Sequence, residues 1–228
     1  MPTDAVLESL LCGRFSCRAF REAPVPEAAI ERMFLLAQRT ASWCNSQAWQ
    51  VHLVSGDDAT AFGCALTEWV VGNGETPDIE PPQRYEDAYR ERRRAAGFGL
   101  YGALGIDRGD IDARRRQMME NFRFFGAPHV AIISSPALLG TYGAVDCGAY
   151  VSTMMTAAES LGIATIAQAA IAMHAEFVRN YLGISSDRHV VCAVSFGFPD
   201  LEHPANSFRT ARAQLGDVIS YVSSGQSR

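Results

Sequence analysis

The chain has 228 residues, of which 48% are hydrophobic and 20% charged, a balance typical of a globular protein with a buried core. Its formal net charge of -5 argues against a nucleic-acid-binding protein, because such proteins normally carry a basic surplus. No stretch reaches the roughly 20 apolar residues of a membrane-spanning helix, and the N-terminus lacks the pattern of a secretory signal. We therefore expect a cytoplasmic protein without a membrane or nucleic-acid partner.

The cysteines and histidines do not form a metal-binding pattern. None of the six cysteines belongs to a C-x-x-C pair, and none has a histidine at the spacing of metal ligands. The sequence therefore predicts no metal site, and it predicts reduced, mostly buried thiols.

A compact cationic stretch, Arg14-Phe15-Ser16-Cys17-Arg18, follows a short predicted helix over residues 4–11. If Phe15 and Cys17 turn inward on an extended segment, Arg14, Ser16 and Arg18 share the opposite face. Two guanidinium groups around a hydroxyl suit a phosphate or another oxyanion, because arginine offers paired donors and keeps its charge. The alternative is a solvated charged surface.

The next part of the chain combines helices with one strand. Apolar residues recur at helical spacing after Pro26, and residues 50–54 alternate like a half-buried strand. Between them lies a loop of small polar and aromatic side chains. The predicted elements are a helix over 27–38, the loop over 40–49, the strand over 50–54 and a helix over 59–71.

Residues 84–116 are crowded with charges of alternating sign and are interrupted by glycines. This pattern predicts two helices in a solvent-exposed excursion. Arginine clusters there also suggest nucleic-acid binding, but the interleaved carboxylates weaken that interpretation. Tyr85, Tyr89 and Tyr101 are instead candidates for an aromatic lid over a pocket, with plain packing as the alternative.

The last part of the chain carries the remaining strands and a helix that is apolar nearly all round. Such a helix is expected at the centre of the fold, with neighbours on several sides. The predicted elements are strands over 129–134 and 189–196, a central helix over 146–161, a short apolar segment over 163–170 and a helix over 176–182. Helices mixed with separated strands predict an α+β fold in one domain over residues 1–228.

The C-terminal tail, residues 213–228, is a separate part of this prediction. Its apolar residues are numerous enough to pack somewhere, including on another subunit. The last residues, 223–228, are predicted to be disordered.

Three polar clusters carry the candidate chemistry, and none contains an acid–base dyad, a nucleophile motif or a phosphate-binding glycine loop. Anion-binding arginines and amides without proton-transfer groups are typical of a protein whose cofactor performs the chemistry. The clusters are Arg14/Ser16/Arg18, Ser42/Asn45/Gln47 and Arg209/Arg212.

With these clusters in view, the chain resembles the FMN-dependent nitroreductase family from about residue 7 to 220. The likeness rests on Arg14-x-Ser16-x-Arg18, Pro24-Val25-Pro26, Ala-Ser-x-x-Asn-x-Gln-x-Trp at 41–49, Gly197-Phe198-Pro199-Asp200 and Arg209-Thr-x-Arg212. It implies a nitroreductase-like fold with a central antiparallel sheet surrounded by helices, in an intertwined homodimer with FMN at the interface. It also implies NAD(P)H as reductant and a small aromatic acceptor, a nitroaromatic or a quinone, in a ping-pong cycle.

The resemblance also implies roles for individual residues. Arg18, the one catalytic candidate, should lie near N1 and O2 of the flavin ring, where a cation stabilises the charge left by hydride transfer. The other cofactor-binding candidates are Arg14, Ser16, Arg209 and Arg212 at the phosphate end, Ser42, Asn45 and Gln47 from the partner subunit or at the ring edge, and Ala167, Gln168 and Ala169 with a backbone N–H near N5. The excursion at 84–116 falls in the family's variable region, which shapes the substrate pocket, and the substrate candidates are Trp43, Tyr85, Tyr89 and Tyr101.

Two positions depart from the family pattern, because Ala41 and Ala48 stand where the family has prolines. Both replacements relax the backbone of the 41–49 loop. Alternative functions are reductive dehalogenation or flavin fragmentation on the same scaffold, and a non-catalytic flavin-binding module.

Overall fold

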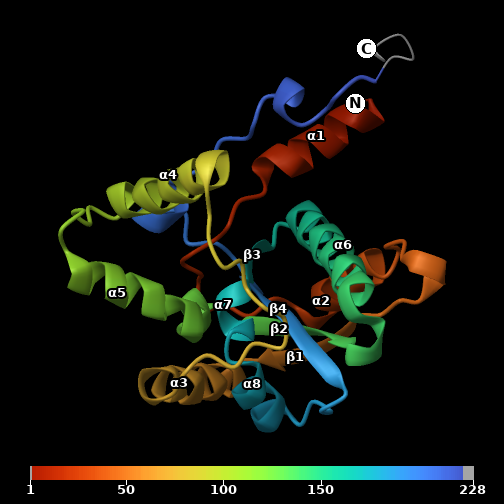
Figure 1. Cartoon of the computed structure of the whole chain (residues 1–228), viewed down its shortest axis with the longest axis horizontal. Helices are drawn as coiled ribbons and strands as arrows, with labels where there is room; N and C mark the ends of the chain where they lie inside the picture. Colours follow the sequence, from red (N-terminus) through yellow and green to blue (C-terminus); the bar gives the residue numbers. More distant parts are fainter. Residues whose placement is uncertain (1, 223–228) are drawn as a thin grey trace.

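A computed structural model of the chain describes residues 2–222. Its centre is a four-stranded, fully antiparallel sheet in the order β1-β2-β4-β3 (Figure 1). The strands are β1 (Gln50–Ser55), β2 (His129–Pro136), β3 (Ala164–Gln168) and β4 (Arg188–Gly197). Helices surround this sheet, which confirms the α+β fold predicted from the sequence.

Helices cover both faces of the sheet, and the side chains of β2 point alternately into the two hydrophobic cores between the sheet and these helices. Ala131 and Ile133 point into the core on one face, whereas Val130 and Ile132 point into the core on the other. This alternation follows from the two-residue period of a strand. The first face carries α2 (Glu27–Ala37) and α6 (Gly140–Ser160), and the second carries α3 (Asp57–Gly72), α7 (Ala169–Ala172) and α8 (Ala175–Leu182).

The central helix α6 packs against α2, β2 and β3, as its apolar sequence predicts. The predicted start at Asp146 is wrong, because the helix begins at Gly140, about 1.7 turns earlier. Gly143 explains the error: it weakens the helical pattern, yet it is needed because a Cβ there would collide with Ser135 Oγ. Among residues 2–222, no helix is both long and apolar enough to cross a membrane.

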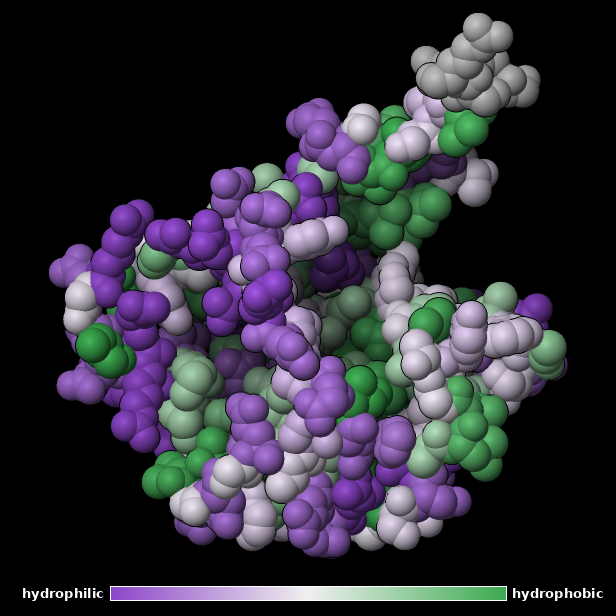
Figure 2. All heavy atoms as spheres, in the orientation of Figure 1, coloured by the Kyte–Doolittle hydropathy of each residue, from purple (hydrophilic) through white to green (hydrophobic). Residues whose placement is uncertain are grey.

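The charged excursion forms the two predicted helices, α4 (Asp87–Ala103) and α5 (Ile111–Met119), which extend to the left of the sheet in Figure 1. Neither helix contains a buried residue. Hydrophilic side chains cover this region in the space-filling view (Figure 2). The excursion rejoins the sheet through η2 (Glu120–Gly126), whose phenylalanines are buried.

The N-terminal segment closes the β3 edge of the sheet. After α1 (Thr3–Gly13), Ser16 forms a parallel bridge with Thr165, and the Cys17 N–H donates to the Thr165 carbonyl at 3.0 Å. Cys17 is fully buried, so the predicted inward turn of this residue is confirmed. The remaining short 3₁₀ turns are η1 (Trp43–Asn45), η3 (Ala137–Leu139), η4 (Pro204–Asn206) and η5 (Leu215–Asp217).

Apolar side chains remain exposed along α1 and the adjoining C-terminal segment, at the upper right of Figure 2. α1 has no buried residue at all. The exposed set comprises Val6, Leu7, Leu11, Leu215, Val218, Ile219 and Tyr221. A single chain therefore leaves this surface uncovered, while residues 223–228, predicted to be disordered, lie outside the described residues.

The thiols differ in part from the prediction. All six cysteines are free, but Cys12, Cys44 and Cys64 are exposed rather than buried. Cys12 lies near the end of α1, Cys64 lies in α3, and Cys44 lies in the loop before β1. The residue type alone therefore does not predict which thiols are buried.

Candidate functional site

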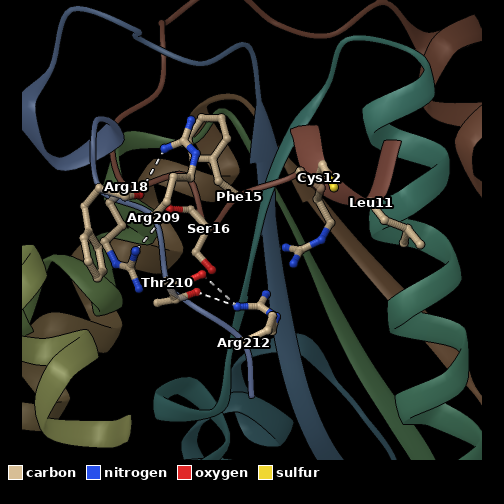
Figure 3. A pocket seen from close by; sticks show the side chains of 10 residues that line it. Leu11, Cys12, Phe15, Ser16, Arg18, Arg209, Thr210 and Arg212 are labelled. Atoms are coloured by element: carbon tan, nitrogen blue, oxygen red, sulfur yellow. Dashed lines mark hydrogen bonds between the residues drawn. The ribbon is translucent and has the colours of Figure 1, made fainter. Parts of the chain in front are cut away.

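Segments from opposite ends of the chain meet around a cavity of about 340 Å³, large enough for a small-molecule ligand. Figure 3 shows the hydroxyl of Ser16 facing Thr210 and Arg212 across it. The lining residues are Leu11, Cys12, Arg14, Phe15, Ser16, Arg18, Phe208, Arg209, Thr210 and Arg212. Two of the three polar clusters predicted from the sequence therefore form one site.

Arg18 is held at this cavity by one hydrogen bond from its side chain and one from its backbone. Its Nη1 donates to the Ser16 carbonyl at 3.1 Å, and its own N–H donates to Asn206 Oδ1 at 2.7 Å. Burial lowers the pKa of Arg18 from its ordinary value, but a guanidinium in a protein stays protonated at neutral pH. Arg18 is thus a positioned, permanently charged donor.

The arginines from the other end of the chain are held by neutral groups. Arg209 stacks on the Phe15 ring, with its guanidinium carbon 3.8 Å from the ring centroid, and it donates to the Asn206 carbonyl at 2.6 Å. Arg212 donates to Thr210 Oγ1 at 2.8 Å. Because neutral partners do not cancel the charge, these side chains remain available to an anion.

Within residues 2–222, none of the four arginines of the cavity forms an ion pair with a carboxylate. Glu159 of α6 lies close enough to interact electrostatically with Arg14 and Arg209. Burial raises its pKa, while Arg14 and Arg209 act in the opposite direction. The cavity therefore holds an excess of positive charge in a partly desolvated place, which favours an anionic ligand.

Sequence reasoning missed Asn206, which holds the two ends of the chain together. Its side chain is buried and also donates to the carbonyls of Ala19 and Asp200, at 2.8 and 2.7 Å. Both the oxygen and the NH₂ group of its side-chain amide are therefore hydrogen-bonded. A lone asparagine in a turn gives no sequence signal of such a role, because only the fold brings its partners near.

The segment at residues 167–169 offers its backbone rather than its side chains. The Gln168 amide is committed to the interior: Nε2 donates to the Asn121 carbonyl at 2.8 Å, and Oε1 accepts from Ser195. Thr165 directs its backbone groups to the edge of β3 that does not pair with β4, since its carbonyl accepts from the Cys17 N–H. Ala167 lies two residues further along and so directs its N–H to the same edge.

The polar loop at 42–47 lies elsewhere in the single chain, beside the start of α6. Asp146 holds it, accepting from the Trp43 N–H at 3.1 Å and from the Ser46 hydroxyl at 2.9 Å. Ser42 Oγ accepts from the Gln47 N–H at 2.9 Å. None of Ser42, Asn45 and Gln47 lines the arginine cavity, so their contact with a cofactor stays a prediction that requires a partner subunit.

This loop has a strained backbone. Cys44, Asn45 and Gln47 have φ values of 51°, 54° and 47°, in the left-handed region. Such conformations cost about 1–3 kcal/mol each and cluster at functional sites. The loop therefore has a strained backbone even though alanines stand at positions 41 and 48, where the family has prolines.

The four substrate candidates also lie outside the arginine cavity. Trp43 is more than half exposed and packs edge-on against Tyr142, with ring centroids 4.1 Å apart. Tyr89 is 69% exposed on α4, and the other two stack with arginines of the excursion. These pairs are Arg93 over Tyr85 and Arg114 over Tyr101. Their contact with a substrate stays a prediction.

The donor set of the cavity fits the phosphate and sugar-alcohol end of FMN. It combines guanidinium groups without carboxylate partners with the hydroxyls of Ser16 and Thr210, and the Phe15 ring provides an apolar wall. The described part of the chain contains no group of three or more histidine, cysteine or acidic side chains that could hold a metal ion.

Comparison with known proteins agrees with the resemblance found in the sequence. The sequence model of the nitroreductase family matches residues 11–198. The chain belongs to the nitroreductase family. This membership confirms the resemblance seen in the sequence and accounts for the arrangement of sheet and helices.

Two curated family members and one solved structure give the scale of the similarity. "Nitroreductase NfnB" of Mycolicibacterium smegmatis is 36% identical over 94% of this chain and 92% of its own length. A "4-nitrobenzoate reductase" of Nocardioides sp. is 31% identical over 97% and 92%, respectively. The crystal structure of the FMN-dependent NfnB in complex with NADPH superposes with a TM-score of 0.92, covering 96% of this chain and 99% of that one at 34% identity.

Proposed function

We propose that the protein is an FMN-dependent NAD(P)H oxidoreductase that reduces nitroaromatic or quinone-type acceptors. The observation that carries the proposal is the meeting of Arg14, Ser16 and Arg18 with Arg209 and Arg212 around one cavity. Family membership supports it, as does the similarity to a 4-nitrobenzoate reductase and to a nitroreductase whose structure was solved with NADPH. No feature of the described residues favours reductive dehalogenation or flavin fragmentation.

The roles of the chain's own residues follow from their positions. Arg14, Ser16 and Arg212 bind the phosphate end of the cofactor, and the stack of Arg209 on Phe15 closes the cavity beside it. Charge-assisted hydrogen bonds from arginine to phosphate are among the strongest that proteins make. This end of the site therefore fixes the position of the ligand.

Arg18 and the edge of β3 act at the ring end. Bound FMN supplies the redox chemistry, taking a hydride from NAD(P)H and passing two electrons to the acceptor in a ping-pong sequence. Arg18 provides a fixed positive charge at the pyrimidine side of the ring, held in place by Ser16 and Asn206. The Ala167 N–H, directed off the strand edge, is a donor to the ring, and Ala169 follows as the first residue of α7.

The complete site requires a homodimer in this proposal. Ser42, Asn45 and Gln47 lie outside the cavity of their own chain, and their strained loop is exposed. The apolar residues left exposed on α1 and the C-terminal segment provide a surface for a second copy. Light scattering coupled to size exclusion tests this point, and a monomer at assay concentration would contradict it.

The experiment for the function has three steps on one preparation. The purified protein is expected to be yellow, to release FMN on denaturation, and to lose its flavin absorbance when NADPH or NADH is added without oxygen. Adding a nitroaromatic or a quinone should then restore the absorbance. A colourless protein that takes up no FMN would overturn the proposal, and a flavin that neither nucleotide bleaches would leave a non-catalytic flavin-binding module.

A further inference from the structure

A second cavity, of about 460 Å³, adjoins the arginine cavity, and Arg18 lines both. It lies between the strand-like segment at residues 18–19, helix α5 and the η2 segment. A ligand in it would sit next to the position that Arg18 holds towards the flavin. The side chains that matter to its chemistry are Arg18, Ile106, Arg116, Gln117, Phe125 and His203.

Phe125, which contributes to the apolar part of this cavity, has an unusual backbone conformation. Phe125 is buried, and it has a φ of 54° between Phe124 at 57° and Gly126 at 74°. A left-handed backbone is a rare and costly conformation for a phenylalanine, and here it occurs twice in succession. The surrounding structure therefore holds Phe125 at this cavity, where Ile106 and Ala113 of the excursion add further apolar groups to a lining that is otherwise largely polar.

The charged part of the cavity is cationic. Arg18 and Arg116 both line it, and neither forms an ion pair within residues 2–222. Glu120 is the only acidic side chain in the lining, and its carboxylate pairs with Arg123 at 3.6 Å. The net charge of the cavity lining is therefore positive, and it favours an acceptor with a negative charge.

His203 adds a ring donor to the lining, and one hydrogen bond indicates its tautomer. The Ala205 N–H donates to His203 Nδ1 at 3.2 Å, so Nδ1 carries no proton in the neutral ring. The proton must then lie on Nε2. His203 and Arg116 both line this cavity, and the Nε2–H and the guanidinium are donors to which a carboxylate can bind.

Building on the proposed function, we propose that this second cavity is the acceptor subsite and that it selects aromatic acceptors bearing a carboxylate. Phe125 and Ile106 pack against the ring, and Arg116 and His203 bind the carboxylate. The position of Arg18 in both cavities places the opposite end of such an acceptor beside the flavin. Arg116 and His203 are thus specificity-determining residues, and the redox step itself does not depend on them.

The test compares Arg116→Gln with Arg115→Gln, a neighbouring exposed arginine of α5 outside the cavity lining. The holoenzyme is assayed with 4-nitrobenzoate and with the neutral 4-nitrobenzamide. We expect Arg116→Gln to raise KM for 4-nitrobenzoate about tenfold to hundredfold, because a hydrogen bond to a charged group is lost. KM for the amide, kcat, and the rate of flavin bleaching by NADPH should stay within about twofold, and Arg115→Gln should behave like the unaltered protein.

A binding measurement separates this proposal from the proposed function. Benzoate, which has no nitro group to reduce, is titrated into the holoenzyme by calorimetry, and Arg116→Gln should weaken its binding by the same factor. Equal losses for the acid and the amide, equal effects of the two variants, or release of FMN by Arg116→Gln would each overturn the acceptor subsite. Absence of bound flavin or of any nitroreduction in the unaltered protein would instead overturn the function itself.

Discussion

The side chain of Asn206 accepts a hydrogen bond from the backbone N–H of Arg18, joining at 2.7 Å two residues that are 188 positions apart in the sequence. The same amide donates to the Ala19 and Asp200 carbonyls. One buried side chain thus sets the distance between the segment that carries Arg14, Ser16 and Arg18 and the turn that leads to Arg209.

Replacing this residue, Asn206→Ala, is expected to lower the free energy of unfolding by about 3 kcal/mol, because it leaves buried backbone groups without partners. The variant should also bind FMN more weakly, because the turn that leads to Arg209 loses its connection to the segment that carries Arg14 and Ser16. Denaturant unfolding and flavin fluorescence measure the two effects. Asn73→Ala removes an exposed amide that bonds only within its own helix end, and it is expected to cost less than about 1 kcal/mol. Equal losses in the two variants would contradict the role of Asn206.

Removal of a phosphate-binding arginine should distinguish FMN from riboflavin, which lacks the phosphate. Arg14→Ala is expected to weaken FMN binding about tenfold to hundredfold, because a charge-assisted contact is lost. Riboflavin binding should change less than about twofold. Titration of flavin-free protein with both ligands measures the difference. Arg39→Ala, an exposed arginine outside the cavity lining, is the control, and a parallel loss of both flavins would place Arg14 outside the phosphate site.

Arg18 is expected to influence the rate of flavin reduction more than the affinity for FMN. Arg18→Gln should slow anaerobic bleaching by NADPH about a hundredfold, the magnitude found when one preorganised donor at a developing charge is removed. FMN binding should weaken far less, because the phosphate contacts remain. Arg18→Lys keeps the charge and should recover much of the rate, as stopped-flow absorbance would show. Identical rates for glutamine, lysine and arginine at this position would exclude the assigned role.

His129 should make the fold sensitive to mild acid. Its Nε2 accepts from the Val25 N–H at 3.0 Å, its Nδ1 lies 2.8 Å from Ser55 Oγ, and burial lowers its pKa below the usual 6.5. Between the lowered value and 6.5 the unfolded chain binds more protons than the folded one. The contribution of neutral His129 to the free energy of unfolding is therefore expected to be complete above pH 6.5, and the free energy of unfolding should fall as the pH drops below that value.

Denaturant titrations of flavin-free protein from pH 8 to 5.5 would measure this loss, without a contribution from a bound phosphate. The pKa values of His52 and His174 are lowered as well, so their contributions have the same sign. His129→Gln should reduce the slope but not abolish it. A stability that stays flat or rises on acidification would show that the folded state tolerates protonation at these positions.

The sequence was sufficient for the parts of the site that depend on local pattern. Arg14, Ser16 and Arg18 could be placed on one face because an extended segment alternates its side chains, and their likeness to a family linked them to Arg209 and Arg212. The fold class followed from the spacing of apolar residues. Helix α6 was misplaced at its start because Gly140 and Gly143 weaken the local pattern there, whereas close packing against Ser135 requires the second glycine.

The contacts that were missed are those between distant parts of the chain. Asn206, Glu159 and Asp146 are ordinary polar residues in sequence, and only the folded chain brings them to Arg18, Arg14 and the Trp43 loop, respectively. The second cavity has the same origin, since Arg116 comes from the excursion and His203 from the turn after β4. Sequence patterns locate groups with a characteristic spacing, but not pairs that meet through tertiary packing.

The stacking of Arg209 on Phe15 has a consequence for the time at which the site can form. During synthesis the segment with Phe15 leaves the ribosome first, and it must wait for nearly the whole remainder of the chain before Asn206 and Arg209 emerge. The sheet and both of its cores can assemble in that interval. The cofactor cavity consequently cannot be completed before Asn206 and Arg209 emerge, and a polypeptide whose translation stops before them would lack this side of the place for the flavin.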